Sequence, residues 1–328
     1  MNNSRVPATA VVLLVVLMLS QAAWAQQIVI DANSVVVRTD SATLLRYCHS
    51  DVPFKPYVKQ LFTPSGINVL LDAPPDHLHH HALMFACAVD GIDFWGEYAG
   101  QTGDRASDNL AAQPGKQEHL RFDDTATRGS PEHRRLRFAE QIRWVSQPQK
   151  TPVLLEHRTI TAGRVGDPMA TFLTWESVLT VPDGKESAVL TGSHYHGLGL
   201  RFIRSMDATG EFRNPDNDPG VIFRGEERLV RSPWCAYTAQ ADGKVVTVAM
   251  FGHPANPRHP TTWFTMAKPF AYLSATLRLH EEPLKVLPGK PLLLRYGVAL
   301  WEGRVETDKI DAIYQHWVAM LPKDDAGQ

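Results

Sequence analysis

Residues 83–95 read Leu-Met-Phe-Ala-Cys-Ala-Val-Asp-Gly-Ile-Asp-Phe-Trp, which is two apolar runs separated by an Asp-Gly pair. Asp-Gly between apolar runs is among the strongest short-range signals for a two-residue hairpin turn, because both turn positions need a positive φ. We therefore expect two antiparallel strands that meet at Asp90-Gly91. A simple register would carry Trp95 and Glu97 back towards the residues that precede the first strand.

The rest of the chain repeats this pattern of short apolar or alternating runs divided by Gly, Pro, Asn and Asp. Further strands are expected at 27–30, 34–38, 42–49, 67–71, 118–122, 136–145, 153–161, 170–181, 188–191, 197–202, 234–238, 244–251, 261–266, 271–279 and 292–300. One helix is expected near the end, with Thr307 as its N-cap and an apolar face from Ile310 to Leu321. These elements predict an all-β fold, a large antiparallel β-sandwich with a C-terminal helix.

Composition and the N-terminus narrow the class of protein. The 328 residues are 44% hydrophobic and carry 33 Lys plus Arg against 35 Asp plus Glu, so nothing is basic enough to favour nucleic acid. Residues 1–25 combine Arg5, an apolar stretch and Ala23-Trp24-Ala25, which predicts a signal peptide and an exported protein, periplasmic or secreted. We expect residues 26–328 to form a single large domain with no membrane span.

Three cysteines are too few for a disulfide-framed scaffold. Cys87 falls inside an apolar run and is expected to be a buried small hydrophobe. A bridge between Cys48 and Cys235 is compatible with export but not required by the sequence.

The densest chemical signal is Asp76-His77-Leu78-His79-His80-His81, just before the first strand of the hairpin. In an extended segment His77, His79 and His81 would share one face, whereas in a turn His79 and His80 would converge. Histidine is both the commonest metal ligand and the side chain that titrates near neutrality. The cluster therefore predicts a functional site.

Two chemistries suit such a cluster. His77, His79 and His80 could hold a divalent metal, together with His253 or a carboxylate, although no His-Glu-x-x-His spacing occurs. Without a metal, one imidazole would act as general base and another as general acid. The metal-free reading is preferred, and the metal stays open as the alternative cofactor.

A second polar group of residues follows the strand at 244–251. Its loop contains three prolines in seven residues, and such stiffness would hold His253 and Asn256 in fixed directions. Trp95 and Trp263 adjoin the two polar motifs and are candidates for stacking on a sugar. Arg201 could clamp a carboxylate or a pair of hydroxyls, although an arginine on a strand is more often a structural ion pair.

Paired motifs along residues 53–318 resemble the bacterial PmoA-type family. The motifs are Lys55-Pro56-Tyr57, Asp76-His77-x-His79-His80, Asp93-Phe94-Trp95, Gly199-Leu200-Arg201, His253-Pro254-x-Asn256-Pro257, Pro260-Thr261-x-Trp263 and Pro288-Gly289. The resemblance implies a supersandwich similar to galactose mutarotase and a role in bacterial carbohydrate breakdown. It also implies functional roles for His77, His79, His80, Arg201, His253 and Asn256, whereas His81 and Ala82 depart from the family's pattern.

We expect an exported carbohydrate-active enzyme that acts on a sugar or oligosaccharide by glycoside cleavage, elimination or epimerisation. His79, His80, His253 and Arg201 would be catalytic, and Asn256, Trp95, Trp263 and His77 would bind substrate. Ordinary glycoside hydrolysis uses a pair of carboxylates. The only candidates for such a pair are Asp93, Glu97 and Asp104, which disfavours this reaction. A metal-dependent oxidoreductase or hydrolase and a non-catalytic glycan-binding protein are the alternatives.

Overall fold

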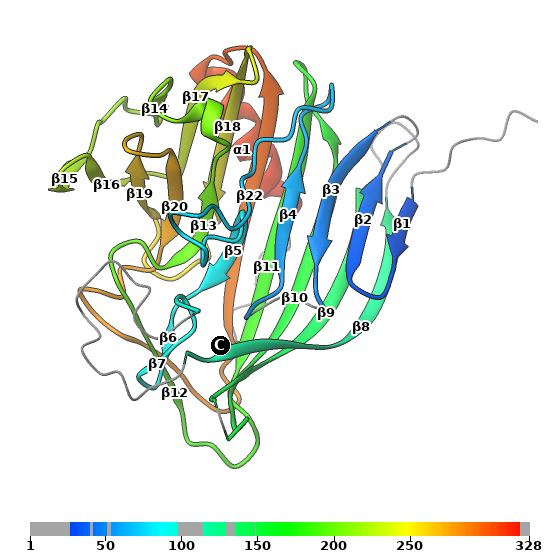
Figure 1. Cartoon of the computed structure of the whole chain (residues 1–328), viewed down its shortest axis with the longest axis vertical. Coiled ribbons are helices and arrows are strands. Elements are labelled where there is room, and N and C mark those ends of the chain that lie inside the picture. The colour runs from blue at the N-terminus through cyan, green and yellow to red at the C-terminus, as the bar shows by residue number, and fades with distance from the viewer. Residues whose placement is uncertain are drawn as a thin grey trace, which may run out of the picture.

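The structure is a computed structural model that describes residues 27–39, 42–50, 54–97, 114–128, 135–147 and 149–321. These residues form three antiparallel sheets, one 3₁₀ turn and one α-helix at the C-terminal end (Figure 1). The predicted all-β antiparallel sandwich with a C-terminal helix is confirmed. The predicted signal peptide lies outside the described residues.

The largest sheet has ten strands and extends across the molecule from one side to the other. In spatial order they are β1 (Gln27–Ile30), β2 (Ser34–Arg38), β3 (Thr43–Cys48), β4 (Tyr57–Leu61), β5 (Leu83–Ala86), β13 (Gly197–Arg201), β20 (Tyr272–Thr276), β19 (Thr262–Met266), β16 (Glu227–Arg231) and β15 (Val221–Arg224). β13 thus joins the N-terminal strands to strands that lie far away in sequence. The edge strand β15 is open: Val221, Ile222 and Phe223 are 76%, 56% and 48% exposed.

The second sheet has eight strands and packs against the first. In spatial order they are β14 (Glu211–Arg213), β17 (Trp234–Ala241), β18 (Lys244–Gly252), β22 (Leu292–Glu302), β11 (Ala170–Thr180), β10 (Pro152–Val165), β9 (Arg135–Val145) and β8 (Lys116–Arg128). Side chains alternate across β11, so Leu173 and Trp175 face the core between the sheets while Phe172 faces outward.

The outward face of the eight-stranded sheet is covered by α1 (Thr307–Met320), visible behind β17, β18 and β22 in Figure 1. Ile310, Tyr314 and Trp317 are buried against that face, as the helical period predicts. Glu306, not Thr307, is the N-cap, and it makes no capping hydrogen bond through its side chain. The expected N-cap was wrong by one residue, because packing of the apolar face sets the start of this helix more strongly than capping does.

The third sheet is small and contains the predicted hairpin. Its strands are β21 (Leu284–Val286), β12 (Ala188–Thr191), β6 (Ala88–Val89) and β7 (Ile92–Asp93). Asp90 and Gly91 have φ of 51° and 79°, as the expected turn requires, and Val89 pairs with Ile92. The single strand expected before the turn is divided at Cys87, because β5 joins the ten-stranded sheet and β6 the small one.

All three cysteines are free, so the Cys48–Cys235 bridge is not formed. Cys48 lies on β3 and Cys235 on β17, in two different sheets. Cys87 is buried, as expected. No helix within the described ranges is long and apolar enough to cross a membrane.

Candidate functional site

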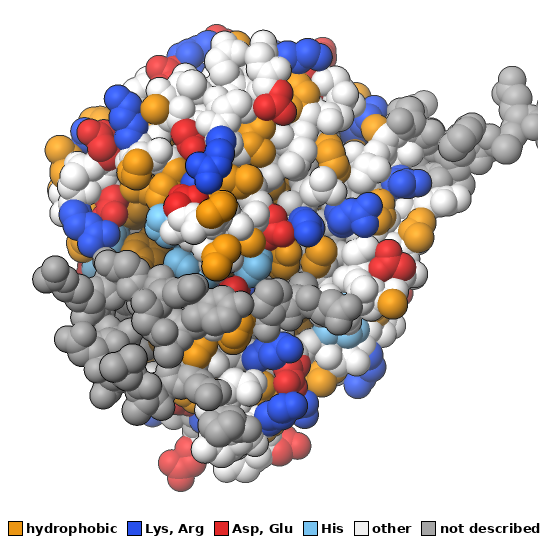
Figure 2. Space-filling model, viewed as in Figure 1, with side chains coloured by type: hydrophobic (Ala, Val, Ile, Leu, Met, Phe, Trp, Pro, Cys, Tyr) orange, Lys and Arg blue, Asp and Glu red, His pale blue; other side chains and the backbone are white. Residues whose placement is uncertain are grey.

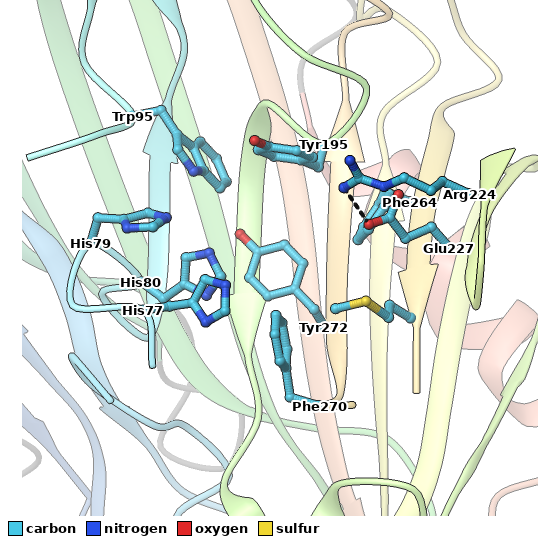
Figure 3. A pocket seen from close by; sticks show the side chains of 11 residues that line it. His77, His79, His80, Trp95, Tyr195, Arg224, Glu227, Phe264, Phe270 and Tyr272 are labelled. Carbon is cyan, nitrogen blue, oxygen red and sulfur yellow. Dashed lines mark hydrogen bonds and ion pairs between the residues drawn. The ribbon is translucent and has the colours of Figure 1, made fainter. Parts of the chain in front are cut away.

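A cavity of about 290 Å³ lies over the strands β20, β19, β16 and β15, where the histidine-rich segment meets them (Figure 3). On the face drawn in Figure 2, histidine side chains reach the surface among hydrophobic ones near the middle of the molecule. The residues that line the cavity are His77, His79, His80, Trp95, Tyr195, Arg224, Glu227, Phe264, Met266, Phe270 and Tyr272.

The histidine-rich segment is a compact turn, so the turn alternative is correct. The backbone N–H of His80 donates to the carbonyl of His77 at 2.9 Å, which places both side chains on one side. Their rings stack with centroids 4.6 Å apart and an angle of 17°. His79 meets His80 edge-on at 4.6 Å, so three imidazoles gather at one wall of the cavity.

His79 and His80 are electrically neutral at pH 7. Burial, and then the positive charge of Lys55, lowers the pKa of His79 to about 4. Burial, and then the neighbouring His79, lowers the pKa of His80 well below its ordinary value. A neutral imidazole can accept a proton, so either residue has the protonation state that a general base needs.

His81 points away from the cavity into a network of charges. Its Nδ1 lies 2.8 Å from Asp72 Oδ1 and its Nε2 lies 2.7 Å from Glu97 Oε1. Burial lowers the pKa of His81, but the two carboxylates outweigh burial and the net pKa is raised. Lys55 is 2.7 Å from the same Glu97 oxygen. This network therefore holds the histidine turn in place on the side that faces away from the cavity. The expected return of Trp95 and Glu97 to the histidine end is confirmed.

Three buried polar atoms at the cavity have no hydrogen-bond partner among the described residues: His80 Nδ1, Trp95 Nε1 and the Tyr272 hydroxyl. The three rings are mutual neighbours, with centroids 5.1 Å apart for His80 and Tyr272, 6.2 Å for His80 and Trp95, and 6.4 Å for Trp95 and Tyr272. In Figure 3 the Tyr272 hydroxyl points into the space between Trp95 and His80. Buried polar groups are nearly always paired, so three orphans in one place indicate a site built for a ligand.

Arg201 does not line the cavity but lies behind the wall that contains Phe270 and Tyr272. It is opposite Tyr272 across the β13–β20 pair, and its guanidinium carbon lies 3.7 Å from the centre of the Phe270 ring. It donates one hydrogen bond, 3.3 Å long, to Asp76, whose other oxygen accepts from Arg204 at 3.1 Å. Arg201 therefore supports the cavity through Phe270 and Asp76.

The opposite wall carries a carboxylate. Glu227 on β16 pairs with Arg224 at 2.8 Å, as the dashed line in Figure 3 marks, and with His194 Nε2 at 3.0 Å. Glu227 is the one carboxylate among the lining residues that the structure describes. Asp93 accepts from the backbone N–H groups of Trp95 and Gly96, and Asp104 lies outside the described residues.

Four of the predicted site residues line the cavity: His77, His79, His80 and Trp95. Trp263 does not. It alternates with Phe264 on β19, so Phe264 faces the cavity while Trp263 faces the other way and donates to the carbonyl of Ser232 at 2.9 Å.

His253 and Asn256 also lie elsewhere. Asn256 donates to the carbonyl of Arg295 at 2.7 Å and accepts from its N–H at 2.7 Å. His253 packs edge-on against Trp317 of α1, with centroids 5.6 Å apart. The loop at 253–260 therefore fastens to β22 and the helix, and it does not meet the histidine turn as expected.

The described residues provide no set of ligands for the divalent metal that was the alternative cofactor. Within the described ranges no three His, Cys, Asp or Glu side chains are grouped so that they could hold a metal ion. His77 and His80 stack face to face and His79 meets His80 edge-on, so the described imidazoles pack against one another rather than forming a group that could bind a metal. The cavity residues therefore do not fit the metal alternative in this conformation.

Tyr272, Glu227 and Tyr195 were not predicted from the sequence. Tyr272 and Glu227 begin strands, and Tyr195 stands in the His194-Tyr195-His196 segment before β13. A polar aromatic at the first position of a buried strand was the available signal for Tyr272. Nothing local distinguishes Glu227 from an ordinary exposed carboxylate.

Fold and site together define an all-β sandwich protein with a histidine- and aromatic-lined cavity. The chain belongs to DUF6807, described as a family of unknown function, and the match spans residues 34–315 and thus every lining residue. No curated protein matches. A solved structure of a polysaccharide lyase is similar over 89% of this chain and 33% of that one, with 9% identity and a TM-score of 0.27. The chain spans about a third of that lyase, and a likeness at this level carries no functional argument.

Proposed function

We propose that this protein is an exported enzyme that acts on a sugar or oligosaccharide by acid/base chemistry in the histidine-lined cavity. The observation that carries the proposal is the group of three orphan polar atoms on His80, Trp95 and Tyr272. Leaving each of them unpaired costs roughly 1–3 kcal/mol, and a bound ligand with its own polar groups would remove that cost. The predicted signal peptide at residues 1–25 supports a location outside the cytoplasm.

The walls suit a sugar ring. Trp95, Tyr195, Phe264, Phe270 and Tyr272 supply apolar faces, on which the C–H face of a pyranose can pack. The polar atoms between these rings would bind its hydroxyl groups. A volume of about 290 Å³ leaves room for one sugar unit and part of a second.

Proton transfer would involve His80 and Tyr272. The neutral His80 imidazole is the base, since its Nδ1 has no partner among the described residues. Burial raises the pKa of Tyr272 well above its ordinary value, so the phenol keeps its proton and can assist the transfer by donating a hydrogen bond to the substrate. Hydrolysis by paired carboxylates is not favoured, because within the described part of the chain Glu227 is the one carboxylate that lines the cavity.

The test is a screen of oligosaccharides with the mature chain, residues 26–328, and with His80→Ala. Loss of a general base reduces turnover by roughly 10²–10⁴-fold. His157→Ala is the matched control, because His157 is a partly exposed histidine on β10 that pairs with Asp123 away from the cavity. Sugar binding without turnover in the wild type would replace the enzyme by a glycan-binding protein. Turnover that survives His80→Ala would refute the assignment of the base.

A further inference from the structure

We infer that the sugar bound in this cavity carries a carbonyl group next to the carbon that gives up its proton. The inference rests on the proposed function and names the substrate class. Its basis is the arrangement of two hydrogen-bond donors, Trp95 Nε1–H and the Tyr272 hydroxyl, beside the unpartnered Nδ1 of His80.

The two donors define what the ligand must offer. An indole N–H donates only, so the ligand atom that meets Trp95 has to be an acceptor. The Tyr272 hydroxyl adjoins Trp95 and His80 in the same part of the cavity (Figure 3). Two adjacent donors are the arrangement that stabilises an oxygen on which negative charge develops.

The base sets a second condition. A neutral imidazole is a weak base, and the C–H bonds of an ordinary sugar are far too weakly acidic for it. A neighbouring carbonyl changes this, because the electrons of the C–H bond move onto the carbonyl oxygen as an enolate. His80 is thus matched to a proton next to a carbonyl, and the described lining residues include no pair of carboxylates for the hydrolytic alternative.

The step balances without any added oxidant, reductant or metal. His80 Nδ1 takes the proton, the C–H pair forms a C=C bond, and the carbonyl oxygen becomes an oxyanion that accepts from Trp95 and Tyr272. When the electrons return, a C–O bond on the next carbon breaks and the leaving oxygen takes the proton from the His80 imidazolium. Return of a proton from His80 to the same carbon restores the substrate, with that hydrogen exchanged for one from the solvent.

Arg201 favours negative charge at this end of the cavity. Its side chain is 1% exposed, and its Nε and Nη1 have no hydrogen-bond partner among the described residues. Arg201 is opposite Tyr272 on the neighbouring strand, and its guanidinium lies over the ring of Phe270. A fixed positive charge in a low-dielectric setting stabilises an anion nearby without having to reorganise.

The experiment is hydrogen–deuterium exchange in D₂O, followed by proton NMR. The probes are methyl pyranosides of gluco, galacto and manno configuration, each as the parent glycoside, as the uronide and as the 3-keto derivative. The uronides and 3-keto derivatives carry the two sources of the carbonyl, a carboxylate and a ketone. We expect loss of the signal next to the carbonyl in at least one of these two sets, at a rate reduced at least ~100-fold by His80→Ala and by Tyr272→Phe.

Tyr237→Phe is the control for the tyrosine substitution, because Tyr237 is buried and its hydroxyl donates to the carbonyl of Met206 at 2.7 Å, away from the cavity. Exchange without protein is subtracted. No exchange in any carbonyl-bearing probe would overturn the inference. His80-dependent cleavage of a parent glycoside would also overturn it, yet would leave the proposed function standing.

Discussion

The hydroxyl of Tyr272 lies directly against the α-carbon of Gly199, so closely that a methyl group at position 199 would overlap it. The two residues lie on the adjacent strands β20 and β13. The same methyl group would also come within 3.3 Å of the Trp95 ring. The absence of a side chain at Gly199 therefore makes the space in which the orphan hydroxyl stands.

Gly199→Ala should disturb the cavity and the fold together. We expect a loss of about 1–3 kcal/mol in the free energy of unfolding, because the Tyr272 ring must move in a packed interior. Denaturant unfolding measures the change. Adding Tyr272→Phe to Gly199→Ala should recover part of the loss, since the hydroxyl is the atom most severely overlapped. Simple additivity of the two substitutions would contradict this arrangement.

Tyr272→Phe should reduce activity without reducing stability. The hydroxyl has no partner among the described residues, so its removal should leave the unfolding free energy unchanged or raise it by up to about 1 kcal/mol. Tyr237→Phe removes a hydroxyl that is hydrogen-bonded to Met206 and should cost about 1 kcal/mol. Thermal unfolding of both variants checks the contrast, and equal losses of stability would count against an orphan hydroxyl at 272.

His79 should make the fold sensitive to acid. Its folded pKa is about 4 and its ordinary value 6.5, so between these values the unfolded chain binds the extra proton and stability falls as the pH falls. The full effect is on the order of 3 kcal/mol. His79→Gln should flatten the dependence of unfolding free energy on pH in this window. An unchanged slope would show that His79 is not buried in its neutral form.

His81 should give the unfolding free energy the opposite dependence on pH. Because its folded pKa is raised, its contribution is fully present below about pH 6.5 and is lost as the pH rises through the folded value. His81→Ala would leave the carboxylates of Asp72 and Glu97 without the cation between them. We expect a cost of about 3–5 kcal/mol near neutral pH, measured by denaturant unfolding. Lys55 lies beside Glu97, and Lys59 lies 3.2 Å from Asp72. A loss below 1 kcal/mol would mean that these two lysines suffice to neutralise the network.

Asn256→Ala should weaken the fold without touching the cavity. Asn256 makes two hydrogen bonds of 2.7 Å to the backbone of Arg295, and their loss in a buried place should cost about 2–3 kcal/mol. Exchange or turnover by the variant, measured at a temperature where it is folded, should equal that of the wild type. A change confined to activity would return the 253–260 loop to the list of site elements.

The sequence predicted the hairpin, the sandwich and four of the eleven described lining residues for a physical reason. Asp90-Gly91 and the histidine turn are local features, and local turn chemistry defines where their neighbours go. The partners of the histidine turn come from β15 to β20, more than 140 residues later, and one sequence does not show that pairing. His253 and Asn256 were misplaced for that reason, and Trp263 because its facing depends on the register of β19.

The open edge of the ten-stranded sheet bears on whether molecules of this protein associate with one another. Val221, Ile222 and Phe223 of β15 offer solvent an apolar strand, and such an edge is a template on which a strand of another molecule can pair. Arg224, the next residue, lines the cavity. Self-association through this edge would place a neighbouring molecule beside Arg224, a residue of the cavity wall.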